Sequence, residues 1–144
     1  NRGSRLKGET MAKVRPINEK KYNIDKHRFM ELYYHCLQYQ KWKEELKYID
    51  DTVRSVQYGT MRGGGSNGSA LERAAIKRRE LEEKCELIEH TALEADSDIC
   101  KYILTGVTQE YATFKYLKQL GLPCERDMYY DRRRKFYYLL SQKI

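Results

Sequence analysis

Two runs of mostly apolar residues, spaced alternately by four and three positions, constrain the fold of this chain more than any other feature. The first run is Trp42, Leu46, Ile49, Val53 and Val56, and the second is Ala74, Arg78, Leu81, Cys85, Ile88, Ala92 and Ala95. A mean spacing of about 3.5 residues is typical of the seam between two packed helices. Five glycines in the eleven residues 59–69 are unfavourable for a helix. We therefore predict an antiparallel, coiled-coil-like helical hairpin over 23–95 with a glycine-rich tip at 59–69.

One polar residue, Arg78, interrupts the second run. It either sets the register of the helix pair or marks the point where the partner helix ends, and the pattern favours neither. Before the first run, Asn23 or Asp25 can cap a helix. Its predicted buried stripe consists of Phe29, Leu32, Tyr33, Cys36 and Leu37, and the pattern changes phase near Gln40.

The segment 1–22 shows no hydrophobic periodicity and is predicted to be a flexible, basic N-terminal arm. Residues 1–28 hold nine Lys or Arg against three Asp or Glu. Met11 is a plausible start of the native chain, so residues 1–10 are expected to be upstream or added sequence.

The last third of the chain predicts three short helices. Asp96 or Ser97 can cap the first, which Gly106 is expected to end as a C′ residue. Thr108 is expected to cap the second, with Tyr111, Phe114, Leu117 and Leu120 facing inward. Gly121-Leu122-Pro123 then predicts a turn before a helix at about 124–142. A helix, a glycine-containing turn and a basic helix are typical of a helix-turn-helix, which we place at 96–144. The predicted fold is all-α throughout.

The last helix has an apolar side and a basic side. Tyr129, Phe136 and Leu140 share one face and are predicted to be buried, and Arg133 lies close to them as an ion-pairing or aromatic-stacking residue. Arginine can bind guanine edges and phosphates through paired hydrogen bonds, and lysine suits phosphate. The candidate DNA-binding residues are Arg126, Tyr130, Arg132, Arg134 and Lys135. A solvated basic helix face is the alternative interpretation.

Composition excludes several classes of protein. The net charge of +7 is concentrated at the two ends, whereas residues 71–98 hold five basic against nine acidic residues, a distribution that suits a polyanion binder. No apolar stretch approaches the roughly 20 residues that a bilayer requires, so we expect a cytoplasmic protein with no membrane association. The four cysteines form no CxxC pair, and we expect neither a metal site nor a cofactor. No nucleophile–base arrangement is present, and we expect no enzymatic activity.

Several stretches resemble a known family. These are SALERAA (69–75), CELIEHTALEAD (85–96), YILTGVT (102–108) and CERDMYYDRRRKFYYLLS (124–141). Together with the predicted layout they resemble phage late-gene transcriptional regulators of the RinA/ArpU type and clostridial prophage proteins, over about residues 42–142. The family's Tyr-x-x-Arg would correspond to Tyr130 and Arg133. The turn with Pro123-Cys124 is one residue longer than in that family, and the helix at 25–39 is additional.

The resemblance implies a DNA-binding phage or prophage transcriptional regulator in the bacterial cytoplasm. Double-stranded DNA is the expected partner, with a homo-oligomer formed through the hairpin and host RNA polymerase as a further partner. Two alternatives remain open: a small-terminase-like DNA-packaging protein, and a helical protein–protein adaptor that binds no nucleic acid.

Overall fold

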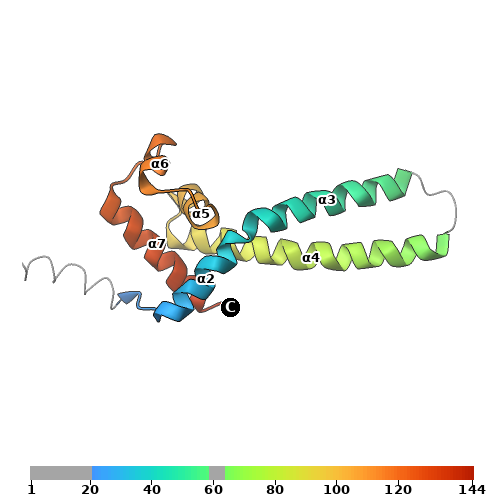
Figure 1. Cartoon of the computed structure of the whole chain (residues 1–144), viewed down its shortest axis with the longest axis horizontal. Coiled ribbons are helices and arrows are strands. Elements are labelled where there is room, and N and C mark those ends of the chain that lie inside the picture. Colours follow the sequence, from blue (N-terminus) through green and yellow to red (C-terminus); the bar gives the residue numbers. More distant parts are fainter. Residues whose placement is uncertain (1–20, 59–63) are drawn as a thin grey trace, which may run out of the picture.

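Every regular element in residues 21–58 and 64–144, the part that the computed structural model describes, is a helix. The all-α prediction is therefore confirmed for this part of the chain. The helices are α2 (Lys26–Leu37), α3 (Tyr39–Tyr58), α4 (Gly64–Ala95), α5 (Cys100–Thr108), α6 (Phe114–Gln119) and α7 (Arg126–Ser141). Figure 1 shows α3 and most of α4 projecting as a stalk from a head that contains α2, α5, α6, α7 and the end of α4.

The stalk consists of α3 and residues 64–80 of α4, which lie side by side and run in opposite directions (Figure 1). Trp42, Leu81 and Cys85 are buried where the stalk meets the head, and Leu46 and Ile49 are partly buried. Apolar burial between the two helices is the main favourable contribution to their pairing. The side chain of Val56 lies outside the described part of the chain.

Arg78 forms an ion pair across the stalk, from its Nη2 to Asp50 Oδ1 at 2.7 Å. Its partner helix therefore continues past this position, which excludes the interpretation that the pairing has ended there. Nearer the head, the Tyr39 hydroxyl donates a hydrogen bond to Glu89, again joining α3 to α4.

The predicted extent of the glycine-rich tip is too long. Helix α4 begins at Gly64, so residues 64–69 are helical, while residues 59–63 lie outside the described part. Once a helix is nucleated, each added residue gains one backbone hydrogen bond. The 32-residue α4 thus extends into a glycine-rich sequence whose intrinsic helix propensity is low.

Helix α2 begins and ends close to the predicted positions. The Asp25 carboxylate accepts hydrogen bonds from the backbone N–H groups of His27 and Arg28, which confirms its role as an N-cap. Leu32 and Cys36 are fully buried. The chain breaks at Gln38, two residues before the predicted phase change. Helix α2 packs mainly against α7 and α5, and so belongs to the head.

The role predicted for Gly106 is wrong, because α5 continues past this residue to Thr108. A Cβ atom at position 106 would lie 2.0 Å from the Tyr129 hydroxyl oxygen and 3.3 Å from Leu117 Cδ1. The glycine is therefore required for the close approach of the Tyr129 side chain rather than for a helix end.

The start predicted for the following helix is also wrong. Thr108 is buried as the last residue of α5, and its hydroxyl donates to the Leu104 carbonyl. Helix α6 instead begins at Phe114, with Thr113 accepting from the backbone N–H of Tyr116. Tyr111 and Leu120 were expected to face inward but are 64% and 50% exposed, because this helix is only six residues long and buries Leu117.

Most of the predicted N-terminal arm lies outside the described residues. Its last residue, Tyr22, packs against Tyr138 of α7, with ring centroids 5.7 Å apart. In the parts of the chain that the structure covers, no helix is long and apolar enough to cross a membrane.

Candidate nucleic-acid interface

The turn between α6 and α7 is set by backbone hydrogen bonds around Gly121. The N–H of Leu122 donates to the Leu117 carbonyl at 3.0 Å, and the N–H of Gly121 donates to the Lys118 carbonyl at 3.1 Å. These two bonds make a Schellman motif, whose C′ residue requires a positive φ. Gly121 has φ +110°, which confirms the predicted turn. Buried Leu122 then anchors the chain on the head before α7 begins.

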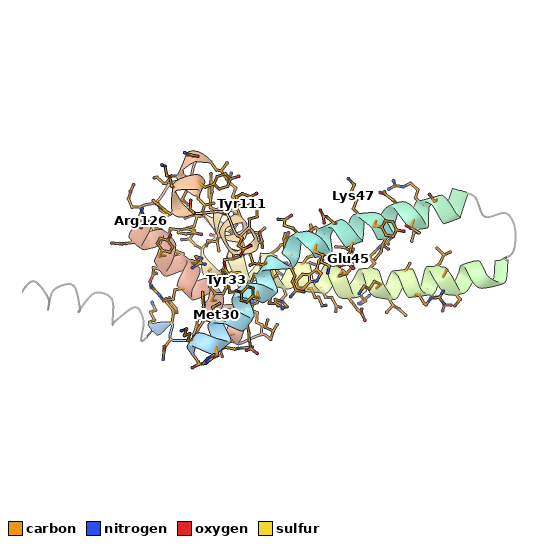
Figure 2. The ribbon with its side chains drawn as sticks, viewed as in Figure 1. Met30, Tyr33, Glu45, Lys47, Tyr111 and Arg126 are labelled. Atoms are coloured by element: carbon orange, nitrogen blue, oxygen red, sulfur yellow. The ribbon has the colours of Figure 1, made fainter. Side chains whose placement is uncertain are left out.

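The first turn of α7 is its most exposed part. Helix α7 begins at Arg126, two residues later than predicted, and Arg126, Asp127 and Met128 are all exposed. The Arg126 guanidinium lies over the Phe114 ring of α6, 4.8 Å from its centroid. Figure 2 places Arg126 at the end of α7 beside α6, on the opposite side of the head from the stalk.

The apolar face predicted for α7 is confirmed. Tyr129, Phe136 and Leu140 are at most 2% exposed, and Tyr137, which was not assigned to this face, is also buried. Burial raises the pKa of the Tyr129 hydroxyl to about 12. This hydroxyl therefore stays protonated at neutral pH, and its part in the structure is to fill the space above Gly106.

Arg132 is held by two carboxylates. Its Nε lies 2.9 Å from Asp96 Oδ2, and its Nη1 lies 2.6 Å from Asp131 Oδ2. The hydrogen bond to Asp96 raises the pKa of the Arg132 guanidinium. Asp96 lies between α4 and α5, so this ion pair ties α7 to the preceding helices.

Arg133 faces the core as predicted. Its guanidinium lies over the Tyr137 ring, 5.2 Å from the centroid. This is the aromatic stacking expected for an arginine next to the buried face.

The remaining candidates, Tyr130, Arg134 and Lys135, are half-buried rather than fully outward. The sequence predicts them outside the apolar face, with Arg134 opposite it and Tyr130 and Lys135 on its flanks, but α7 packs against α2, α4 and α5, so little of its surface is free. Tyr130 packs edge-on against Tyr129, with centroids 5.1 Å apart. Within the described residues, no carboxylate forms an ion pair with Arg126, Arg134 or Lys135.

Two features of this region were missed in the sequence. Lys115 is exposed on α6 and forms no ion pair with any described residue; a cation on the helix before the turn is the signal that could have identified it. The second feature is a cavity that Tyr130 and Arg134 share with residues 22–24. No local pattern could have placed that segment beside α7.

The cysteines are all free thiols. Cys36, Cys85 and Cys124 are buried, and burial raises the pKa of Cys36 to about 12. Such thiols pack as small apolar groups and are poor nucleophiles at neutral pH. The described residues contain no cluster of three or more His, Cys, Asp or Glu that could hold a metal ion.

Comparison of the chain with protein-family models, with curated proteins and with solved structures gives no match.

Proposed function

We propose that this protein is a sequence-specific DNA-binding regulator in which α6, the Gly121 turn and α7 act as a helix-turn-helix. The observation that carries the proposal is the exposed first turn of α7, where Arg126 lies four residues after Leu122, the last residue of the Schellman turn. In helix-turn-helix proteins the N-terminal residues of the recognition helix contact base edges in the major groove.

The unpaired cations divide into two groups under this proposal. Arg126, at the free end of α7, is suited to reading a base edge through its paired donors. Arg134 and Lys135 further along α7, with the Tyr130 hydroxyl and with Lys115 on α6, would contact phosphates and so set the position on DNA. Arg132 is engaged by Asp96 and Asp131, so its proposed contribution is to hold α7 in place.

The resemblance to the RinA/ArpU-type regulators supports the same function. It adds a phage or prophage setting in the bacterial cytoplasm, with host RNA polymerase as a further partner. The stalk supports the proposed homo-oligomer, because Tyr48 on α3 and Ile76 on α4 are 72% and 62% exposed. Apolar side chains exposed on both helices are suited to packing against a second copy.

Fluorescence anisotropy tests the proposal. The full chain would be titrated into a duplex that it has itself selected from a random pool, and into an unselected duplex, across a salt series. The selected duplex should bind at least about a thousandfold more tightly than the unselected one, as is typical of specific regulators. Arg134→Ala should weaken binding to both duplexes and reduce the salt slope by about one phosphate contact. Arg126→Ala should mainly reduce discrimination between the two.

Arg79→Ala is the matched control, because Arg79 is an exposed arginine on the stalk that pairs with Glu83 of its own helix. It removes the same charge and should leave both affinities unchanged. If neither duplex binds below micromolar concentration at moderate salt, the proposed DNA-binding function is wrong. Binding that weakens equally in Arg79→Ala and Arg134→Ala would reject the assignment to α7.

A further inference from the structure

A cavity of about 460 Å³ lies between α7 and the segment 22–24 that leads into α2. Aromatic rings from Tyr22, Phe29 and Tyr130 line it together with Arg133, Arg134 and Tyr137. Its volume falls within the roughly 300–1,000 Å³ that small-molecule sites occupy. The lining combines apolar surface with a few polar groups, as such sites do.

The charged groups of this cavity are all positive. Arg133 and Arg134 contribute two guanidinium groups, and no Asp or Glu belongs to the lining. Neither arginine forms an ion pair with any described residue. Two partly buried cations without a carboxylate favour an anionic occupant, and guanidinium groups are well matched to phosphate oxygens.

A third polar group of the lining has no hydrogen-bond partner among the described residues. Tyr137 is 1% exposed, and its hydroxyl is buried without a hydrogen-bond partner. Its ring is held by the Phe29 ring, with centroids 4.9 Å apart, and by the Arg133 guanidinium. Buried hydroxyls are nearly always hydrogen-bonded, and because Tyr137 belongs to the cavity lining its unpaired hydroxyl is a candidate donor to an occupant.

The other part of the lining is aromatic. The Tyr22 ring comes from the segment before α2, the Phe29 ring from the first turn of α2, and the Tyr130 ring from α7. Flat aromatic side chains favour a flat aromatic occupant through stacked or edge-to-face contacts. The cavity therefore offers cationic donors together with ring-binding surface.

We propose that this cavity binds a free nucleoside monophosphate. The phosphate would accept hydrogen bonds from Arg133, Arg134 and the Tyr137 hydroxyl, and the base would pack among Tyr22, Phe29 and Tyr130. A phosphate group supplies three acceptor oxygens, which suits three donor side chains better than a carboxylate with two. The cavity shares Arg134 and Tyr130 with the phosphate contacts proposed for DNA, but Arg126 lies outside it. A titration without DNA therefore tests the cavity separately.

Isothermal titration of the full chain with AMP, GMP, CMP and UMP, without DNA, tests this site. At least one nucleotide should bind saturably with one site per chain. Inorganic phosphate and the matching uncharged nucleoside should each bind at least about tenfold more weakly, because each occupies only part of the cavity. If every nucleotide binds no more tightly than inorganic phosphate, the proposed packing of the base among Tyr22, Phe29 and Tyr130 is wrong.

Two variants test the donors directly. Arg134→Gln and Tyr137→Phe should each weaken nucleotide binding about tenfold, the usual effect of losing one hydrogen bond to a charged group. Tyr137→Phe should not lower the melting temperature, since it removes an unpaired hydroxyl from the folded protein. Arg79→Gln removes the same charge from an exposed arginine on the stalk, outside the cavity, and should leave the affinity unchanged.

Several outcomes would overturn the proposal. One is that no nucleotide binds saturably at millimolar concentration. Another is that Arg134→Gln and Tyr137→Phe leave the nucleotide affinity unchanged. A short single-stranded oligonucleotide that binds more tightly than its mononucleotide would assign the cavity to a nucleic-acid strand instead. Because DNA is absent from the titration, failure here leaves the proposed DNA-binding function untouched.

Discussion

At the scale of single residues, Gly106 is a position where packing allows little change. The Tyr129 hydroxyl occupies the space that any side chain at position 106 would need. A close contact between two buried atoms cannot be relieved without moving α5 away from α7, because protein interiors are close-packed.

Gly106→Ala should lower the free energy of unfolding by about 1–3 kcal/mol, the usual cost of overpacking. Urea denaturation followed by circular dichroism measures it. Gly68→Ala is the matched control, because no atom lies within 4 Å of a Cβ at that helical glycine. It should stabilise by about 0.5–1 kcal/mol. In a Tyr129→Phe background, Gly106→Ala should cost clearly less; an equal cost would contradict the contact.

His35 is a second residue whose surroundings determine its behaviour. It packs edge-on against Trp42, with ring centroids 5.0 Å apart, and its buried Nε2 has no hydrogen-bond partner within 21–58 and 64–144. Burial lowers the pKa of His35, and the positive charges of Lys84 and Arg28 lower it further. The folded state therefore disfavours a proton that the unfolded chain binds near pH 6.5.

The stability that neutral His35 contributes is complete above pH 6.5 and is lost as the pH falls through its folded-state pKa. The free energy of unfolding should decrease below pH 6.5, by at most about 1.4 kcal/mol per pH unit. Thermal unfolding between pH 5.5 and 7.5 measures this slope. His35→Phe should flatten it, whereas His27→Gln, at an exposed histidine, should not. An unchanged slope in His35→Phe would assign the pH dependence elsewhere.

At the scale of helices, α7 is positioned by ionic as well as apolar contacts. Arg132 and Asp96 are 36 residues apart in the sequence, and their side chains are 33% and 11% exposed. A hydrogen-bonded pair with one partner mostly buried is worth more than a surface ion pair. Arg134, two residues further along α7, has no such partner among the described residues.

Arg132→Ala and Arg134→Ala therefore make a matched pair on one helix. Arg132→Ala should lower the free energy of unfolding by about 1–3 kcal/mol, because it leaves Asp96 without its partner. Arg134→Ala should change it by less than about 0.5 kcal/mol. Urea denaturation separates the two. Equal losses of stability would show that the Asp96 ion pair has no special part in holding α7.

At the scale of the whole molecule, the stalk and the head differ in how much of their apolar surface is buried. The head buries the continuous core between α2, α4, α5 and α7, whereas the stalk is two helices thick. Two paired helices leave much of their apolar surface exposed, as Tyr48 and Ile76 show. The proposed oligomer would bury these two side chains against a second copy of the stalk.

We expect the chain to form an oligomer through the stalk, and Ile76→Glu should convert it to a monomer in sedimentation velocity. Leu93→Glu is the control, because Leu93 is also exposed on α4 but lies at the head. A dimer would favour transcriptional regulation, and a closed ring would favour DNA packaging. A wild-type protein that stays monomeric at about 100 μM would contradict the expectation.

The sequence by itself predicted the all-α class, the Asp25 cap, the Gly121 turn, the buried face of α7 and the seam positions that are buried, which are Trp42, Leu81, Cys85, Ile88, Ala92 and Ala95. Each of these depends on residues within one or two helical turns, because burial on one side of a helix imposes a local period. Only the tertiary structure decided that Gly106 accommodates Tyr129, that Arg132 pairs with Asp96 and that Tyr22 lies against α7. These features depend on which surfaces meet, and residues far apart in the chain carry no local pattern that reveals their contact.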